Sequence, residues 1–187
     1  LDGIEKHLGK IANQIIDLDK AAARKDIIDI NRILREINYS FLLADDLQHV
    51  LRGVLMPLLN SKNRIEGKED LLEFLDVILD LLQTKAKDLS KKDLDIYLKK
   101  VIGLTVYYLD KIKDDNFVGV CDRVIEIYRQ GGYQEDAYLA VLGMKSDCVD
   151  KEQRVEIRNH IIECGLRDLE KEENAKLILL AAWKHIK

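Results

Sequence analysis

Apolar side chains recur at intervals of three and four residues along nearly the whole chain. Near its start the sequence places Ile4, Leu8, Ile11, Ile15 and Leu18 in steps of four, three, four and three. This spacing puts the side chains on one face of an α-helix, whereas a half-buried strand requires alternation with a period of two. The sequence has no sustained alternation and a single proline. It therefore predicts an all-α fold with more than about 65% helix and no sheet.

The N-terminal part of the chain has the pattern of a helical hairpin. A second apolar stripe, from Ile27 to Phe41, follows the first after a short charged link, which predicts two antiparallel helices. Asn38 and Ser40 favour a break near the end of this stripe, because their side chains compete for backbone hydrogen bonds. The helical spacing resumes up to residue 58, and Pro57 should kink or end that helix because proline lacks the N–H group.

Residues 71–82 are the most apolar segment and have one narrow polar stripe. The polar positions of the segment and its immediate flank are Glu73, Asp76, Asp80 and Gln83. A helix with so little polar surface is expected to be central and covered on most sides. We therefore predict nearly complete burial of Leu75, Ile78 and Leu79.

Capping signals divide the rest of the chain into further helices. Ser90 with Asp93 resembles a capping box and begins one helix, and the Gly131–Gly132 pair should end another, with at least one glycine at positive φ. In total we expect about eight or nine antiparallel helices with short connections, either an α-solenoid-like array or a closed helical bundle. The whole of 1–187 should form a single all-helical domain, in which 1–60 can be an N-terminal helical subdomain and 69–187 a helical array.

One turn resembles a known helical repeat. Tyr128, Gly132 and Ala137 match the positions at which the tetratricopeptide repeat family ends its first helix, turns, and admits a close second helix. Tyr133 stands one residue early for that family's turn aromatic, Val149 replaces its late proline, and no second copy follows about 34 residues away. The resemblance implies stacked helices that bind protein partners. A different stacked-helix array and a closed bundle stay open as alternatives.

Two carboxylate–histidine sets have spacing suited to metal ligation. The first set is Asp45, Asp46 and His49, and the second is Glu156, His160 and Glu163. Di-iron bundles use a Glu-x-x-His motif twice with two further glutamates, whereas the related motif occurs once here and with Asp. Arginines interspersed in the second set equally fit a charged outer face. We therefore predict no metal and no other cofactor, and keep a helical-bundle metal-binding protein as the alternative function.

Several classes of activity find no support in the sequence. Phosphate-binding glycine loops, the G-x-S-x-G motif and H-E-x-x-H are all missing, so an enzyme is the less favoured class. The formal net charge of −4 disfavours nucleic acid as a partner. No apolar run reaches the roughly 18 residues of a membrane span. Three cysteines without C-x-x-C spacing favour reduced thiols and a cytoplasmic location. Because Leu1 rather than Met opens the chain, we expect a fragment.

Tyrosines are the candidate partner-binding residues. They are Tyr97, Tyr108, Tyr128 and Tyr133. The first two are eleven positions apart and share a helix face, although such residues more often lie at the core boundary with the ring buried and the hydroxyl wet. The leading hypothesis is a non-catalytic α-helical scaffold or protein–protein interaction module that binds a protein partner or self-associates.

Overall fold

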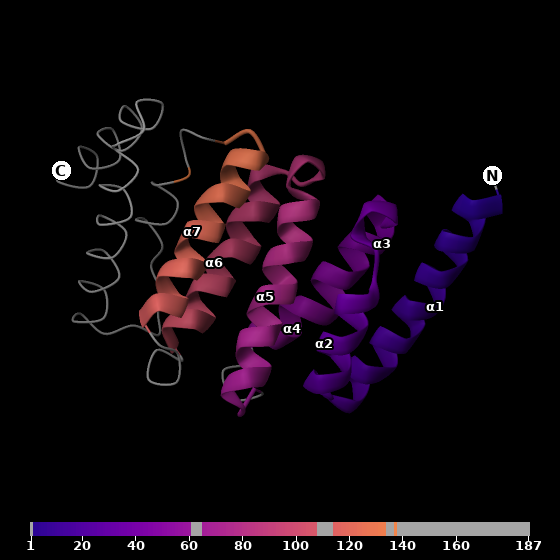
Figure 1. The fold of residues 1–187 in the computed structure, drawn as a ribbon, viewed down its shortest axis with the longest axis horizontal. Helices are drawn as coiled ribbons and strands as arrows, with labels where there is room; N and C mark the ends of the chain where they lie inside the picture. The colour runs from indigo at the N-terminus through magenta and orange to yellow at the C-terminus, as the bar shows by residue number, and fades with distance from the viewer. Residues whose placement is uncertain (1, 61–64, 108–113, 134–136, 138–187) are drawn as a thin grey trace. The chain divides into compact units, whose positions relative to one another are not determined.

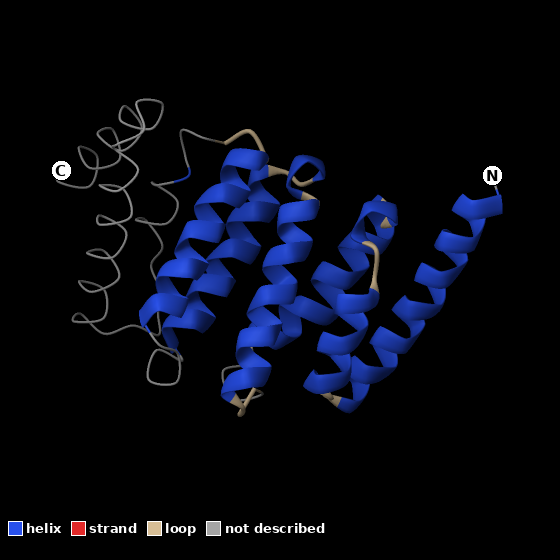
Figure 2. Ribbon diagram, in the orientation of Figure 1, coloured by secondary structure: helices blue, strands red, loops and turns tan. Residues whose placement is uncertain are grey.

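The computed structural model describes residues 2–60, 65–107, 114–133 and 137. Within these residues every regular element is a helix, and 86% of them are helical, which confirms the all-α prediction (Figure 2). The described part of the chain contains six helices when α3, η2 and α4 are taken as one continuous helix. The larger helix number expected for the whole chain stays a prediction.

The chain divides into two compact units, Leu1–Asp88 and Leu89–Lys187. The first unit holds α1 to α5 and the second holds α6 and α7 (Figure 1). The expected single domain, with a subdomain at 1–60, stays a prediction. Within the first unit, α5 (Lys68–Thr84), which lies outside 1–60, packs on α2.

The first unit begins with a hairpin of two packed helices, α1 (Asp2–Arg24) and α2 (Ile27–Glu36). α1 is followed directly by Lys25, which has a φ of 58°. Its amide donates to the Ala22 carbonyl at 3.0 Å, and the Asp26 amide donates to Ala21 at 3.1 Å. These two bonds close a left-handed helix stop of the Schellman type. Asp26 then caps α2 by accepting a hydrogen bond from the Asp29 amide at 3.1 Å.

The predicted break after α2 is confirmed at Asn38. Ile37 leaves the helical conformation, with a ψ of 129°. The Asn38 side chain then accepts a hydrogen bond from the Ser40 amide at 3.2 Å, so it satisfies a backbone donor outside the helix. A short 3₁₀ turn, η1 (Tyr39–Phe41), connects α2 to the next helix.

The next helix changes its winding halfway along its length. It comprises α3 (Ala44–His49), the π-helical turn η2 (Val50–Leu55) and α4 (Met56–Leu59). In the π-helical turn the Met56 amide donates to Leu51, five residues back. In a regular α-helix the ring of Pro57 would meet the Gly53 carbonyl. The chain therefore widens immediately before the proline, and the helix ends two residues after it.

α5 (Lys68–Thr84) contributes eight buried side chains to the core and packs against α2. Leu75, Ile78 and Leu79 are 2%, 1% and 1% exposed, so their predicted burial is confirmed. The 3₁₀ turn η3 (Ala86–Asp88) closes the unit. Because α2 contacts both α1 and α5, it occupies the middle of the first unit.

In the second unit α6 (Lys91–Tyr107) packs against α7 (Asp114–Gln130). Ser90 caps α6 as predicted, since its hydroxyl accepts a hydrogen bond from the Asp93 amide at 3.1 Å. Gly132 lies two residues after the end of α7, and its φ of 90° confirms the predicted left-handed stop. Here too the turn is of the Schellman type, because the Tyr133 amide donates to the Tyr128 carbonyl at 2.9 Å.

Candidate functional site

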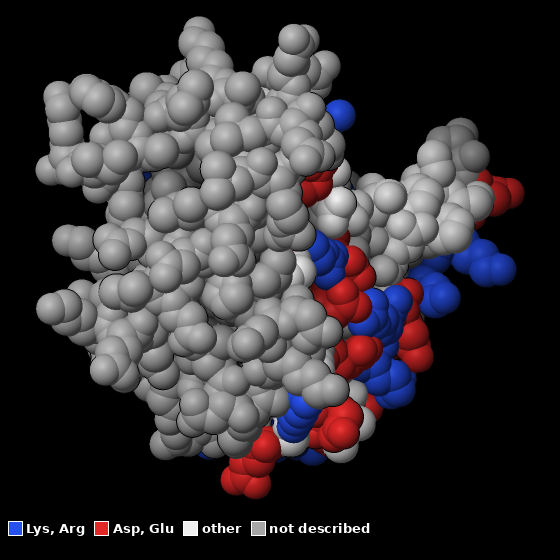
Figure 3. Space-filling view, turned by 60° about the vertical axis from the view of Figure 1, so that its left-hand side comes forward, with Lys and Arg blue, Asp and Glu red and all other residues white. Residues whose placement is uncertain are grey.

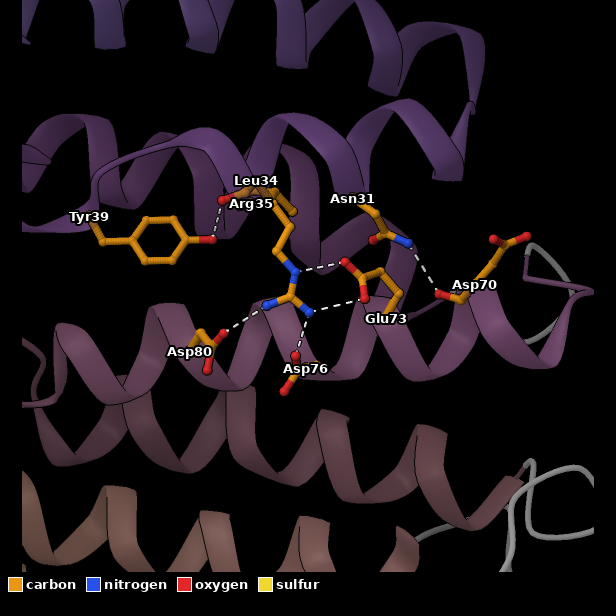
Figure 4. A network of polar contacts seen from close by, with 8 residues as sticks. All are labelled: Asn31, Leu34, Arg35, Tyr39, Asp70, Glu73, Asp76 and Asp80. Atoms are coloured by element: carbon orange, nitrogen blue, oxygen red, sulfur yellow. Dashed lines mark hydrogen bonds and ion pairs between the residues drawn. The ribbon is translucent and has the colours of Figure 1, made fainter.

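One arginine connects α2 to α5 through three carboxylates (Figure 4). The Arg35 guanidinium donates to both oxygens of Glu73 at 2.7 and 3.0 Å, to Asp80 at 3.1 Å, and to Asp76. The acids stand at i, i+3 and i+7 on α5, so they share one face of that helix. They are members of the narrow polar stripe that the sequence places on this helix. The Arg35 network therefore ties the last turn of α2 to the middle of α5.

The electrostatics of this network are those of a structural ion cluster. The hydrogen bonds that Arg35 donates to Glu73 lower the pKa of the Glu73 carboxyl group. The hydrogen bonds to Glu73 and Asp76 raise the pKa of the Arg35 guanidinium. The charged groups are all about two-fifths exposed, at 38% for Arg35 and 43–45% for its partners. Solvent therefore screens them, and each pair stabilises the fold by only a modest amount.

Two neighbouring polar side chains add backbone contacts to the same junction (Figure 4). Asn31 is buried, and its amide nitrogen donates to the Asp70 carbonyl at 3.1 Å. The Tyr39 hydroxyl donates to the Leu34 carbonyl at 2.6 Å, and burial raises the pKa of that hydroxyl. The Arg35 network and these bonds fix η1 and α5 against α2. The junction is therefore cross-linked by side chains that join α2 to both η1 and α5.

The carboxylate partner of His49 lies on α1, whereas the sequence predicts a partner on the same helix as His49. Its Nε2 is 2.8 and 2.9 Å from the two carboxylate oxygens of Asp19 on α1. Both side chains are about half exposed. Asp45 and Asp46 lie in the first turn of α3. In the described residues no group of three or more His, Cys, Asp or Glu side chains is placed to hold a metal ion. The second candidate set, Glu156, His160 and Glu163, lies outside the described residues.

The candidate tyrosines differ in accessibility. Tyr97 and Tyr128 are buried, and the Tyr128 hydroxyl donates to Asp95 on α6 at 2.7 Å. Tyr133 is half-buried after the Gly132 turn, and Tyr108 lies outside the described residues. In this conformation Tyr97 and Tyr128 build the core of the second unit, which leaves Tyr133 as the accessible member of the described three. Their partner-binding role stays a prediction.

The turn that resembles a tetratricopeptide repeat has two of the expected local features. Gly132 adopts positive φ, and Ala137 is fully buried, as a close approach of helices at Ala137 requires. The Schellman turn and a buried small residue are common to many helical hairpins. Val149 lies outside the described residues. The resemblance to the repeat family therefore stays a prediction.

The apolar stripe of α1 is covered along only part of its length. From Ile11 onward the stripe is buried, including Ile15 and Leu18, and α1 contacts α2 and η2. Nearer the N-terminus, Leu8 is half-buried and Ile4 is 53% exposed. Figure 1 shows this end of α1 diverging from the other helices of its unit. The helix therefore continues past its neighbours and carries uncovered apolar side chains.

A second group of apolar side chains lies beside this end of α1. The ring of Phe41 in η1 stacks on His7, with ring centroids 4.7 Å apart and planes 7° from parallel. Leu43 follows two positions later and is 58% exposed, and two residues of chain span at most about 7 Å. We call Ile4, Leu8, Phe41 and Leu43 the α1–η1 surface. Periodicity alone does not reveal this surface, because a covered stripe and an uncovered stripe have the same spacing.

Charged side chains elsewhere on the first unit are mixed in sign. On α2, Arg32 bonds Asp29 at 2.6 Å and Glu36 at 3.4 Å, and Asp29 also accepts from Arg24 at 2.9 Å. Basic and acidic groups also lie side by side on the described part of the face in Figure 3. Pairing of this kind neutralises charge locally, as is usual for a solvated helix surface.

No protein-family model matches this sequence, and no curated protein and no solved structure is significantly similar to it. Within the described part of the chain, none of the helices combines the length and the apolar character needed to cross a membrane. The candidate function therefore depends on the geometry of the described residues alone.

Proposed function

We propose that this chain is a non-catalytic α-helical scaffold that binds a protein partner through the α1–η1 surface. The observation that carries the proposal is the uncovered end of the α1 stripe, where Ile4 lies on the same turn as the His7–Phe41 stack. Isolated exposed apolar residues are normal on soluble proteins. Apolar residues that gather on two adjacent elements mark interaction sites more often.

The surface has a firm support, which favours binding without large rearrangement. Phe41 belongs to η1, and η1 is held to α2 by the Tyr39 hydroxyl at 2.6 Å. α2 is held to α5 by the Arg35 network. A preorganised surface loses less conformational entropy on binding than a flexible one. We further propose that the whole chain has about eight or nine antiparallel helices, in an α-solenoid-like array or a closed bundle.

A comparative capture experiment tests the proposed function. The tagged full chain, its Ile4→Glu/Leu43→Glu variant and its Ile16→Glu variant are incubated with a native lysate, and retained proteins are quantified. Ile16 lies on the same helix and is 52% exposed, which makes it a matched control for Ile4. We expect at least one protein to be retained by the wild type and by Ile16→Glu, and to be reduced at least about tenfold by the double variant.

Two outcomes would contradict the proposal. In the first, no retained protein distinguishes the double variant from Ile16→Glu, although all variants have the wild-type helix content by circular dichroism. In the second, protein purified without chelator or nickel contains about one equivalent of a transition metal that His49→Ala removes. That result would favour the metal-binding alternative.

A further inference from the structure

We infer that the α1–η1 surface accepts an amphipathic α-helix of another protein, with basic residues beside its apolar face. This inference rests on the proposed function and specifies the chemistry of the partner. It follows from the kind of contact the surface offers and from the charges at its border.

The surface favours a helix over an extended segment because it offers side chains and no free backbone edge. The backbone N–H and C=O groups of α1 are engaged within the helix over most of its length, so an added strand would find no ladder to extend. Ile4 and Leu8 are one helical turn apart, about 6 Å along the axis. Phe41 and Leu43 form the adjacent side. A partner helix with apolar residues at i, i+3 or i+4 and i+7 can contact both sides at once.

Acidic side chains border the apolar residues on both elements. On α1, a rotation of about 100° per residue places exposed Glu5 beside Leu8, Lys10 on the side of His7, and Lys6 on the opposite face of the helix. Exposed Asp45 and half-buried Asp46 follow Leu43 in the first turn of α3. The N-terminal dipoles of α1 and α3 each contribute roughly half a positive charge. The three carboxylates outnumber the single Lys10 at this border, which leaves it acidic and complementary to lysine or arginine on a partner.

The same charges disfavour a second copy of this chain as the occupant. In a two-fold contact both copies present the same patch, so an acidic border would meet an acidic border. The uncovered part of α1 also spans about two turns, which is shorter than the three or four heptads that indicate a coiled coil. Like charges across a contact weaken association. A basic helix from a different protein meets neither difficulty.

Designed peptides provide a direct test on the full chain. The probe is a labelled peptide of about 18 residues, with leucines at i, i+3, i+4 and i+7 and lysines elsewhere. One control peptide replaces every lysine with glutamate, and a second keeps the composition but scrambles the leucine spacing. We expect the lysine peptide alone to bind and to shift the amide resonances of residues 4–8 and 41–45. Binding should weaken as salt rises, because exposed charges are screened.

Variants of the protein locate the contact and test its charge. Ile4→Glu should reduce the affinity for the lysine peptide at least about tenfold, whereas Ile16→Glu should change it by less than about twofold. The variant Glu5→Lys/Asp45→Lys should weaken binding of the lysine peptide and strengthen binding of the glutamate peptide. This charge swap is the result that a merely sticky apolar surface would not give.

The inference is overturned if the glutamate or the scrambled peptide binds as tightly as the lysine peptide, or if Ile16→Glu weakens binding as much as Ile4→Glu. It is also overturned if the protein alone sediments as a dimer that Ile4→Glu dissociates, because a second copy would then cover the surface. If the capture experiment succeeds while the lysine peptide fails to bind, the proposed function stands and only the basic-helix partner is wrong. Failure of the capture experiment contradicts the proposed function itself.

Discussion

α1 and α5 are both long amphipathic helices of the first unit, yet their apolar residues have different environments. In α5, every apolar side chain from Leu71 to Leu82 is buried except that of Leu72, which is half-buried. In α1, burial begins only at Ile11, although the stripe starts at Ile4. The difference comes from the neighbours, since α5 lies in the core and α1 extends past the helices that cover it. Residue spacing therefore determines which face of a helix is apolar. The neighbouring elements determine how much of that face is buried.

The largest effect should come from deleting side-chain volume in α5. Leu79→Ala should lower the free energy of unfolding by about 2–5 kcal/mol, because a cavity would remain in a packed core. Chemical denaturation of the full chain measures the change. A loss smaller than about 1 kcal/mol would mean that α5 is peripheral, and the contrast with α1 would collapse.

The junction between α2 and α5 should show a smaller, pH-dependent effect. Arg35→Gln should cost about 1 kcal/mol at neutral pH, since it leaves three acids on one face of α5 without their shared cation. Because Arg35 lowers the folded-state pKa of Glu73, this contribution is present above the usual glutamate pKa of about 4.3. It is lost as the pH falls through the lowered value.

Denaturation at pH 7 and pH 3 should therefore show that the wild type loses its advantage over Arg35→Gln in acid. Arg32→Gln is the matched control, because Arg32 bonds Asp29 and Glu36 within α2 alone. It should cost less than Arg35→Gln, because exposed local pairs contribute little to stability. An equal cost for both variants would mean that the Arg35 network adds nothing beyond an exposed local pair.

The turn between α1 and α2 should become more stable when its left-handed residue is glycine. Lys25 has a φ of 58°, a conformation that glycine adopts with little strain and other residues at a cost of roughly 1 kcal/mol or more. Lys25→Gly should therefore raise the free energy of unfolding by about 0.5–1 kcal/mol. Lys20→Gly, at an exposed position inside α1, should lower it by about as much. If both changes destabilise, the backbone of Lys25 is not left-handed in solution.

The smallest effect is expected at the uncovered end of α1. Ile4→Ala should change the free energy of unfolding by less than about 0.5 kcal/mol, because little of the side chain leaves contact with the protein. Amide hydrogen exchange should likewise be faster in residues 4–10 than in α5, because few apolar contacts protect them. A loss of more than about 1 kcal/mol would indicate that Ile4 is buried in solution, and the α1–η1 surface would then lose a member.

Much of the fold could be predicted from local signals in the sequence. Asn38, Ser90 and Gly132 each have a side chain or a backbone preference that marks a helix boundary, and the structure places a boundary at each. Burial of the α5 core followed from its narrow polar stripe. The π-helical turn was missed, because Pro57 indicates a disturbed helix without specifying how the backbone adapts.

The candidate site was harder to predict because its contacts join distant parts of the chain. His49 was grouped with Asp46 on its own helix, whereas its hydrogen-bond partner is Asp19, 30 positions earlier. The three acids of the α5 stripe were noted, but Arg35, 38 to 45 positions away, was not connected with them. A row of acids on an otherwise apolar helix is nevertheless a usable signal, since such a row offers several acceptors to one cation on a neighbouring element.

The π-helical turn links the number of residues in this helix to the presence of one proline, Pro57. A turn closed by bonds between residues five apart contains one residue more than an α-turn, so the segment from Val50 to Leu55 holds a surplus residue. Deleting Gly53 alone would bring the ring of Pro57 against the preceding turn, and replacing Pro57 alone would leave the surplus residue without its cause. The double variant should lose less stability than the sum of the losses of the two single variants, so the two changes are not additive. We therefore expect related sequences to contain either both the extra residue and the proline or neither of them.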